Sequence, residues 1–183
     1  MMTCIVGLST AEGVWIGADS AAVSGLGARA SSLPKAFRVG EFIIGYTSSF
    51  RMGQILQHHL EIKPQGEESD MEYMVRSFAE SVRKALKDKG YMVVKDSQET
   101  GGTFLVGYNG RLYEVNSDLQ VNQYRDGLGA VGCGGSYAFG ALYASVLDDL
   151  SPETCIQRAL ETAAYFSGGV LPPFTVEYQA RRG

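Results

Sequence analysis

The chain has 183 residues and a formal net charge of −4, a weakly acidic balance that argues against nucleic acid as its main partner. Hydrophobic residues make up 45% and charged residues 20%, as in a soluble globular protein long enough to bury a substantial core. No apolar stretch approaches the roughly 20 residues that span a bilayer. No basic segment precedes an apolar one at the start, so we expect neither a membrane segment nor a secretory signal.

The cysteines and histidines indicate neither disulfides nor a metal site. Cys4, Cys133 and Cys155 are odd in number and widely spaced, which favours a reducing cytoplasm over a disulfide framework. His58 and His59 are adjacent and would point about 100° apart on a helix, so they make a poor metal pair and are interpreted as surface helix residues. We therefore expect a cytoplasmic protein without a metal or another cofactor.

The first predicted elements are two apolar strands, residues 4–8 and 14–18, joined by a short polar connection. An antiparallel hairpin centred on Ala11 would pair Thr3 with Asp19, with Cβ atoms about 4.5–5.5 Å apart. A hydroxyl and a carboxylate would then share one end of a sheet, joined by an α-amino group if Thr3 were the first residue. Few structural hairpins need such an arrangement.

A second hairpin, residues 36–39 and 42–46, surrounds a two-residue turn that begins with Gly40. In this register Lys35 pairs with Tyr46, at the end of the hairpin away from the turn.

Two helices are predicted next. The first begins at Ser48 or Ser49, either of which can cap it, and its apolar residues recur at helical spacing. The second begins with Asp70 as its N-cap and ends at Gly90 after a lysine-rich last turn, as the helix dipole favours. The buried stripe expected on this second helix consists of Met71, Met74, Val75, Phe78, Val82 and Leu86.

The third part of the chain returns to strands. Residues 103–108 and 111–115 surround Asn109-Gly110, a strong signal for a type I′ hairpin. Other predicted elements of this part are strands over 119–124, 129–132 and 174–178, and helices over 136–150 and 152–166, the latter capped by Ser151 with proline at its first position.

The order of these elements is strands, two helices, strands, two helices and a last strand. Hairpins imply antiparallel sheets, and two separate helix pairs imply two outer layers. The expected fold is therefore α+β, a four-layer αββα sandwich with two antiparallel sheets between helix pairs. No internal repeat or linker divides the sequence, so we expect one domain, residues 1–183.

Thr3 is followed by Asp19 sixteen residues later and by Lys35 thirty-two residues later. Three shorter segments accompany them in order: Gly17-Ala18-Asp19-Ser20, Val131-Gly132-Cys133-Gly134-Gly135 and Ser167-Gly168-Gly169. Together these features resemble the proteasome β-subunit family, including the shorter bacterial HslV type, over nearly the whole chain. In that family an N-terminal threonine precedes the aspartate and the lysine at the same intervals, followed by V-G-S-G and S-G-G segments. The resemblance implies an N-terminal-nucleophile hydrolase with the four-layer fold.

The implied reaction is peptide-bond hydrolysis through an acyl-threonine on Thr3. A threonine hydroxyl needs an adjacent base, and a free N-terminal amine supplies one, with a reference pKa near 7.7–8.0. The ammonium of Lys35 would lower the pKa of both the hydroxyl and the amine. Asp19 would hold Lys35 in place and keep it charged.

Three further site residues are assigned only by the resemblance. The backbone amide of Ser49 would bind the oxyanion, at a position where the family usually has glycine. Cys133 replaces a serine that helps the amine to move its proton, and the relay would be poorer because a thiol forms weaker hydrogen bonds. Ser167 is retained, whereas Ala164 stands where the proteasome type, but not the HslV-like members, has an aspartate.

The resemblance also implies a specificity pocket and partners. Ala22, Leu33 and Thr47 align with the walls and floor of the pocket, which predicts a small or apolar substrate side chain. Family members form stacked rings of six or seven subunits fed by an ATP-dependent AAA+ unfoldase. We therefore expect polypeptide substrates and a homo-oligomeric ring. The unfoldase is expected to be a separate protein, because this sequence contains no phosphate-binding loop of its own.

Met1 and Met2 precede Thr3, and a retained residue there leaves the Thr3 nitrogen acylated and without a basic lone pair. Either a chain start closer to Thr3 or a self-cleavage step would expose the amine. Two alternatives remain open. A catalytically inactive ring or scaffold subunit is favoured by Met1-Met2, Cys133 and Ala164. An amidase acting on a small molecule is the other, although the short helices and near-minimal length favour the ring-forming peptidase.

Overall fold

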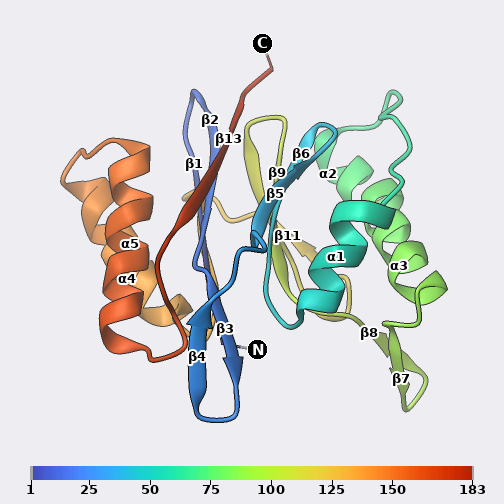
Figure 1. Cartoon of the computed structure of the whole chain (residues 1–183). Helices are drawn as coiled ribbons and strands as arrows, with labels where there is room; N and C mark the ends of the chain where they lie inside the picture. The colour runs from blue at the N-terminus through green and yellow to red at the C-terminus, as the bar shows by residue number, and fades with distance from the viewer. Residues whose placement is uncertain (1, 183) are drawn as a thin grey trace.

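Two antiparallel sheets face each other in the middle of the molecule, and helices cover the outer face of each sheet (Figure 1). A computed structural model describes residues 2–182 of the chain, the side chain of Lys95 excepted. The layers follow in the order helix, sheet, sheet, helix, so the expected four-layer α+β sandwich is confirmed.

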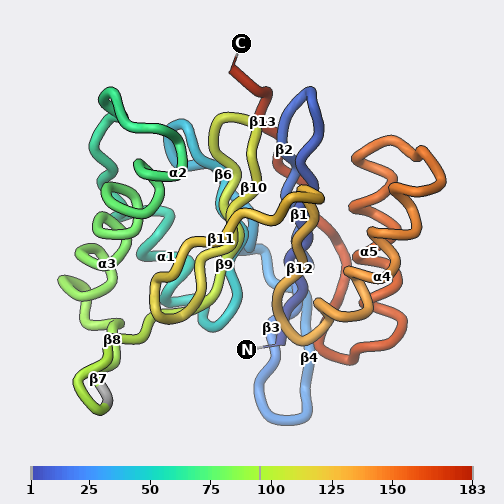
Figure 2. Tube along the Cα trace, turned by 180° about the vertical axis from the view of Figure 1, so that it is seen from behind, coloured from blue at the N-terminus to red at the C-terminus, as the bar shows by residue number. Residues whose placement is uncertain are grey.

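The first sheet has the strand order β12-β1-β2-β13, with every neighbouring pair antiparallel. Its strands are β1 (Cys4–Ser9), β2 (Gly13–Ala18), β12 (Leu128–Gly132) and β13 (Thr175–Ala180). Its outer face is covered by α4 (Gly135–Leu147) and α5 (Pro152–Phe166). Seen from behind, β12 runs beside β1 and leads directly into α4 (Figure 2). Elements far apart in the sequence therefore meet beside the start of β1.

The second sheet has the order β11-β10-β9-β6-β5 and is also antiparallel throughout. Its strands are β5 (Ala36–Val39), β6 (Phe42–Tyr46), β9 (Phe104–Tyr108), β10 (Arg111–Val115) and β11 (Val121–Asn122). Its outer face is covered by α1 (Phe50–His59), α2 (Asp70–Tyr73), the π-helical turn η1 (Met74–Phe78) and α3 (Ala79–Asp88). Buried aromatic and aliphatic side chains, among them Phe42 stacked on Tyr108, fill the layer between sheet and helices.

A cluster of buried aliphatic side chains lies between the two sheets. Its members are Ile5, Val14, Ile16, Ala18, Ala36, Ile43, Leu105, Leu112 and Val131. Burying this apolar surface is the main contribution that holds the two sheets together. Lys35 directly precedes Ala36 of this layer, so the chain carries a lysine to the margin of an aliphatic core.

The register of the first hairpin differs from the prediction by one residue. Ile5 pairs with Ala18 and Leu8 with Trp15, so Thr3 is not paired with Asp19 across the two strands. The reason is the turn: the Thr10 amide donates to the Gly13 carbonyl at 2.8 Å, which leaves two residues at the tip and moves the centre past Ala11. The observed register also places Leu8 and Trp15 in the same cluster under α5, as period-two alternation requires.

The other hairpins follow the sequence pattern closely. The prediction for residues 36–46 is confirmed, because Ala36 pairs with Gly45 and the Tyr46 amide donates to the Lys35 carbonyl at 3.0 Å. Asn109 and Gly110 both have positive φ, 50° and 69°, as a type I′ turn requires.

The second predicted helix is interrupted by the π-helical turn η1. The whole helical segment begins with α2, whose N-cap is Ser69 and not Asp70, and Ser69 forms a capping box with Glu72. Each extra residue in a π turn shifts the phase of the apolar stripe. As a consequence Met71 and Val75, which were expected to be buried, are 39% and 48% exposed.

Several boundaries also differ from the prediction. The strand expected over 119–124 is reduced to β11, and the helix expected over 136–150 ends as α4 at Leu147. Two hairpins were not anticipated: β3 (Ala21–Ser24) with β4 (Gly27–Ala30), and β7 (Val93–Lys95) with β8 (Gln98–Thr100). None of the helices between residues 2 and 182 combines the length and the apolar composition that crossing a bilayer requires.

Candidate active site

The carboxylate of Asp19 is the centre of the candidate site. Asp19 lies one residue beyond β2 and is 1% exposed. Its Oδ1 accepts three hydrogen bonds, from Thr3 Oγ1 at 2.6 Å, the Cys4 amide at 2.9 Å and Lys35 Nζ at 2.9 Å. The Asp19 amide in turn donates to the Cys4 carbonyl at 3.2 Å, which ties this end of β2 to β1. Thr3 and Asp19 therefore meet through a side chain, although the two residues are not paired in the sheet.

The second oxygen of Asp19 is bound by the backbone. The Ala21 amide donates to Oδ2 at 2.8 Å and the Leu171 amide at 3.4 Å. A carboxylate with this many donors is satisfied although it is buried. Leu171 could not be recognised from the sequence, because any residue except proline offers a backbone amide and this one lies 152 positions from Asp19.

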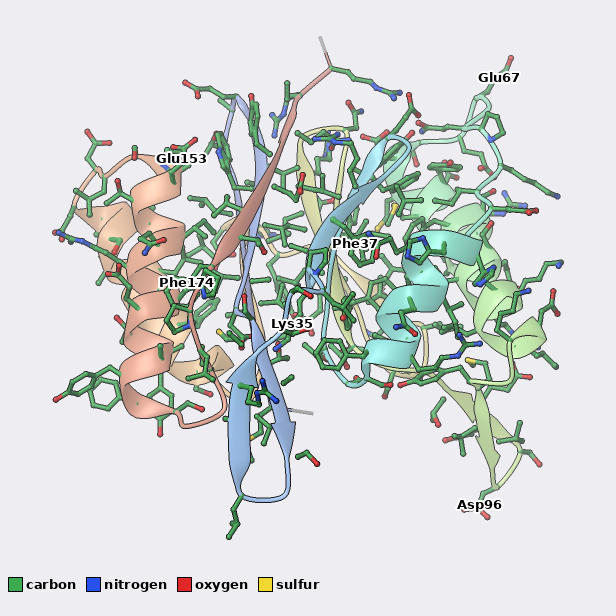
Figure 3. The ribbon with its side chains drawn as sticks, viewed as in Figure 1. Lys35, Phe37, Glu67, Asp96, Glu153 and Phe174 are labelled. Atoms are coloured by element: carbon green, nitrogen blue, oxygen red, sulfur yellow. The ribbon has the colours of Figure 1, made fainter. Side chains whose placement is uncertain are left out.

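Lys35 is the cation of the site. It lies between the two sheets, just before β5, and is 1% exposed (Figure 3). Besides its ion pair with Asp19, its Nζ donates to the Met2 carbonyl oxygen at 3.4 Å. Burial lowers the pKa of Lys35 below its ordinary value, while the charge of Asp19 acts in the opposite direction. The Lys35 ammonium is thus easier to deprotonate than an exposed lysine.

Thr3 is fully buried and its nitrogen is an amide, because Met2 precedes it. The amide donates to Cys133 Sγ at 3.3 Å, and the thiol donates back to the Thr3 carbonyl at 3.4 Å. Gly132, with a φ of 98°, makes this contact possible: a Cβ at this position would collide with the Thr3 carbonyl oxygen. Glycine before Cys133 therefore lets the end of β12 close onto the start of β1.

Cys133 and Ser167 lie at neighbouring ends of the two outer helices. Cys133 is exposed and stands two residues before α4, and Ser167 is the C-cap of α5. Their Sγ and Oγ atoms are 3.6 Å apart, within hydrogen-bond reach for sulfur. Ala164, half-buried on α5, packs against the apolar cluster between α5 and the sheet. The structure thus brings together Thr3, its neighbours Asp19 and Lys35, and the pair formed by Cys133 and Ser167.

The Ser49 amide lies in a different environment from the one expected. Ser49 is the N-cap of α1, and its backbone N–H donates to the Thr47 carbonyl at 2.8 Å. This hydrogen bond spans only Ser48, whose φ of 71° belongs to the left-handed region that non-glycine residues rarely adopt. The Thr103 amide donates to Ser48 Oγ at 3.3 Å and holds the turn. An amide already bonded to Thr47 is not free to bind an oxyanion.

The three residues assigned to the specificity pocket come from three places in the fold: Ala22 from β3, Leu33 from the segment between β4 and β5, and Thr47 from the residue after β6. Ala22 is half-buried in β3, and Thr47 is buried with its hydroxyl donating to the Thr103 carbonyl at 2.6 Å. Leu33 is 47% exposed and lines a pocket of about 280 Å³ together with Tyr46 and residues of α1. Neither Ala22 nor Thr47 lines that pocket.

Met2 covers the site. Its side chain packs so closely on Gly169 that a Cβ there would collide with it, and Met2 itself is 44% exposed. Removing Met2 would therefore uncover Thr3 from the side of the S-G-G segment. Within residues 2–182 no group of three or more His, Cys, Asp or Glu side chains is placed to hold a metal ion.

No family model and no curated protein matches the sequence. Solved structures match it over nearly its whole length. BPH of Thiobacillus denitrificans has a TM-score of 0.82 at 20% identity, covering 97% of this chain and 98% of that chain, and its complex with epoxomicin has a TM-score of 0.83 at 20% identity, covering 98% and 100%. HslV of Trypanosoma brucei has a TM-score of 0.68 at 19% identity, covering 97% and 99%. The Anbu complex of Pseudomonas aeruginosa, a helical assembly, has a TM-score of 0.67 at 16% identity, covering 97% and 81%. The chain has the proteasome-like N-terminal-nucleophile hydrolase fold.

Proposed function

We propose that this chain, which has the proteasome-like fold, is a threonine-type endopeptidase subunit whose nucleophile is the Thr3 hydroxyl once the Thr3 amine is free. Residues 1–183 form one domain in this proposal. One observation carries it: Thr3 Oγ1 lies 2.6 Å from Asp19 Oδ1, which also holds Lys35 Nζ at 2.9 Å. A hydroxyl, a carboxylate and a buried cation in direct contact are costly to assemble for structural reasons alone.

The reaction proceeds in two steps. Thr3 Oγ1 attacks the carbonyl carbon of the substrate peptide bond, and its proton passes to the free Thr3 amine. The tetrahedral intermediate collapses, the proton moves to the leaving amine, and an ester of Thr3 remains. Water, deprotonated by the same amine, then hydrolyses the ester. Lys35 lowers the pKa of the hydroxyl, and the pair Cys133 and Ser167 lies where it can relay the proton.

The oxyanion requires a backbone donor, and the Ser49 amide is our candidate. This amide must first leave the Thr47 carbonyl, which it binds at 2.8 Å. The active form therefore differs from the described one in the turn at Ser48. Ala22, Leu33 and Thr47 remain the proposed specificity residues, with a small or apolar substrate side chain between them.

The Thr3 amine becomes free by one of two routes. If translation begins at Met2, the small second residue Thr3 permits removal of the initiator methionine. Otherwise Thr3 Oγ1 attacks the Met2 carbonyl carbon, and the hydroxyl proton passes to the Thr3 nitrogen, so that the Met2–Thr3 amide becomes an ester with a free Thr3 amine. Water then hydrolyses this ester and releases the dipeptide Met1-Met2 with a terminal carboxylate. The second route is supported by Lys35, whose Nζ lies 3.4 Å from the Met2 carbonyl oxygen and can stabilise its developing charge.

The assembly belongs to the same proposal. A helical assembly is reported for Anbu of Pseudomonas aeruginosa. We infer that this chain forms a homo-oligomeric ring of six or seven subunits in the cytoplasm, stacked on a second ring. Unfolded polypeptides are the substrates, and an AAA+ unfoldase supplies them.

A non-catalytic ring or scaffold subunit is the second candidate, and the Ser49–Thr47 hydrogen bond favours it. A subunit without a free oxyanion donor needs no exposed Thr3. The third candidate, a small-molecule amidase, shares the nucleophile but differs in substrate.

The experiment compares a protein that starts at Thr3, released from a removable fusion, with the same protein carrying Thr3→Ala. We expect the first to hydrolyse fluorogenic peptides and the second to be inactive. Epoxomicin, which BPH of Thiobacillus denitrificans binds, serves as a probe and should inhibit the first protein. Hydrolysis of small amides without peptides would support the amidase, and no hydrolysis of either would support the scaffold subunit.

A further inference from the structure

Four segments of the chain line a polar pocket at one end of the sandwich. The turn between β1 and β2 contributes residues 9–11, and the connection between β11 and β12 contributes residues 123–127. Two arginines complete the lining, Arg111 at the start of β10 and Arg181 directly after β13. The pocket has a volume of about 350 Å³, at the lower end of the range for small-molecule sites. We call it the arginine pocket.

The arginine pocket is separate from the candidate active site. Thr3 lies directly before β1, whereas Ser9 is the last residue of that strand, and a strand of this length spans about 20 Å. Figure 1 shows the β1–β2 turn and the end of β13 together, at the opposite end of the molecule from β3 and β4. The proposed peptidase reaction involves no residue of this pocket.

Hydrogen bonds between distant segments hold the walls of the pocket in place. The Ser9 amide donates to the Gly127 carbonyl at 2.8 Å, and Ser9 Oγ donates to the Gly110 carbonyl at 2.9 Å. Gly110 also accepts a hydrogen bond from Arg181 Nη2 at 3.3 Å, and the Arg181 amide donates to the Glu12 carbonyl at 2.9 Å. The guanidinium group of Arg181 is therefore positioned before any ligand binds, which reduces the entropy lost on binding.

The charged side chains that line the pocket are mainly cationic. They are Arg111, Arg125 and Arg181, against one carboxylate, that of Asp126. Arg111 pairs with Asp70 at 3.3 Å, but within residues 2–182 neither of the other two arginines forms an ion pair. In the whole chain, by contrast, 20 acidic residues outnumber 16 basic ones. Like charges in one pocket repel each other, and a bound anion would offset that repulsion.

We propose that the arginine pocket binds a small anion that contains two or more linked phosphate groups. Guanidinium groups donate paired hydrogen bonds to phosphate oxygens, and arginine suits such planar recognition better than lysine. Arg125 and Arg181 offer two cations without ion pairs, which a single carboxylate group could not neutralise. The side chains of Thr10 and Gln123 add neutral hydrogen-bond donors to the wall. This binding site goes beyond the proposed peptidase and does not depend on it.

Equilibrium dialysis with radiolabelled pyrophosphate tests the proposal, because it counts bound ligand directly. We expect saturable binding of one pyrophosphate per chain, and an affinity about tenfold or more lower in Arg125→Gln and in Arg181→Gln. Both arginines are exposed, so neither substitution disturbs the core. Arg158→Gln is the matched control: it removes the same charge from an exposed arginine on α5 and should leave the affinity unchanged.

Competition distinguishes the two sources of linked phosphates. Displacement of the label by ADP at lower concentrations than by unlabelled pyrophosphate would support the pocket and identify a nucleotide as its ligand. Displacement by ADP that is no better than that by pyrophosphate would support the pocket and indicate a free polyphosphate.

Three results would overturn the proposal: no saturable binding of pyrophosphate, tighter binding of citrate than of pyrophosphate, or an equal loss of affinity in Arg158→Gln. The last result would show a diffuse attraction to the positive charges of the chain. Dialysis requires no catalytic activity, so a chain that binds pyrophosphate but hydrolyses no peptide would contradict only the peptidase. An active chain that binds no pyrophosphate would contradict only the arginine pocket.

Discussion

Thr3 Oγ1 donates a 2.6 Å hydrogen bond to Asp19 Oδ1, the same oxygen that accepts from Lys35 Nζ at 2.9 Å. All three side chains are almost completely removed from solvent. The hydroxyl, the carboxylate and the cation are thus one unit, and a change in any member alters the charge balance of the other two.

The ion pair is expected to be strongly coupled. Asp19→Asn leaves the Lys35 ammonium buried without its counter-charge and should lower the free energy of unfolding by about 3–5 kcal/mol. Lys35→Met in the same chain removes the uncompensated charge, so the double variant should recover at least about 1 kcal/mol of that loss. Urea denaturation of the unaltered chain, the Asp19→Asn and Lys35→Met single variants and the double variant measures the coupling energy. Additive losses would show that the two side chains do not act as a pair.

The Lys35 pKa also predicts a pH dependence. Burial lowers this pKa, so between the lowered value and 10.5 the unfolded chain holds the Lys35 proton and the folded chain does not. The free energy of unfolding therefore gains a contribution that rises with pH through this window and is complete above 10.5. Lys35→Met removes the contribution.

Denaturation at several alkaline pH values, with the variant subtracted from the unaltered chain, measures that rise. Burial raises the pKa of Tyr46, Tyr108 and Tyr113 to about 12, which lowers stability above their ordinary value of 10, but these tyrosines are present in both proteins and cancel in the difference. A difference that stays flat or falls as the pH approaches 10.5 would contradict the lowered Lys35 pKa.

The turn at Ser48 predicts that two small substitutions of this residue differ in peptidase activity. Ser48→Gly and Ser48→Ala both lose the hydroxyl, but only alanine disfavours a positive φ, by about 1–2 kcal/mol. Alanine should therefore release the Ser49 amide more readily. In the protein starting at Thr3 we expect kcat/KM of Ser48→Ala to exceed that of Ser48→Gly by up to about thirtyfold. Equal values, or a more active glycine variant, would show that the turn does not limit the reaction.

Replacing Cys133 with serine is expected to increase the rate of peptide hydrolysis. A serine hydroxyl forms stronger hydrogen bonds than the thiol that now lies 3.3 Å from the Thr3 nitrogen. In the protein starting at Thr3, Cys133→Ser should raise kcat, whereas Cys133→Ala, which cannot relay a proton, should lower it about tenfold or more. Because Cys133 is exposed, both variants should unfold at nearly the same urea concentration as the unaltered chain. Equal kcat values in the serine and alanine variants would remove the thiol from the relay.

The sequence allowed the layers of the fold to be predicted because hairpin turns and helix caps are local signals. The two-residue turn at Gly40 set the correct pairing of Lys35 with Tyr46. The connection between Ser9 and Gly13 has no such turn signal, and the predicted register was one residue wrong. The π-helical turn η1 left no trace in the apolar spacing, so Met71 and Val75 were placed on the wrong face.

The candidate site was predictable only in part. The spacing of Thr3, Asp19 and Lys35, read through the family resemblance, selected three residues that do lie in contact. The hydrogen bond of the Ser49 amide depends on the backbone conformation of Ser48, and serine gives no sequence signal for a positive φ.

The most direct test is peptide hydrolysis by two forms of the same chain, one starting at Thr3 and the other starting at Met2 with Met2 confirmed by intact mass. The first form should turn over fluorogenic peptides, and the second should be inactive because its Thr3 nitrogen is an amide. Thr3→Ala in the first form should lower turnover about a thousandfold or more. Equal turnover by both forms, or turnover that survives Thr3→Ala, would contradict Thr3 as the nucleophile.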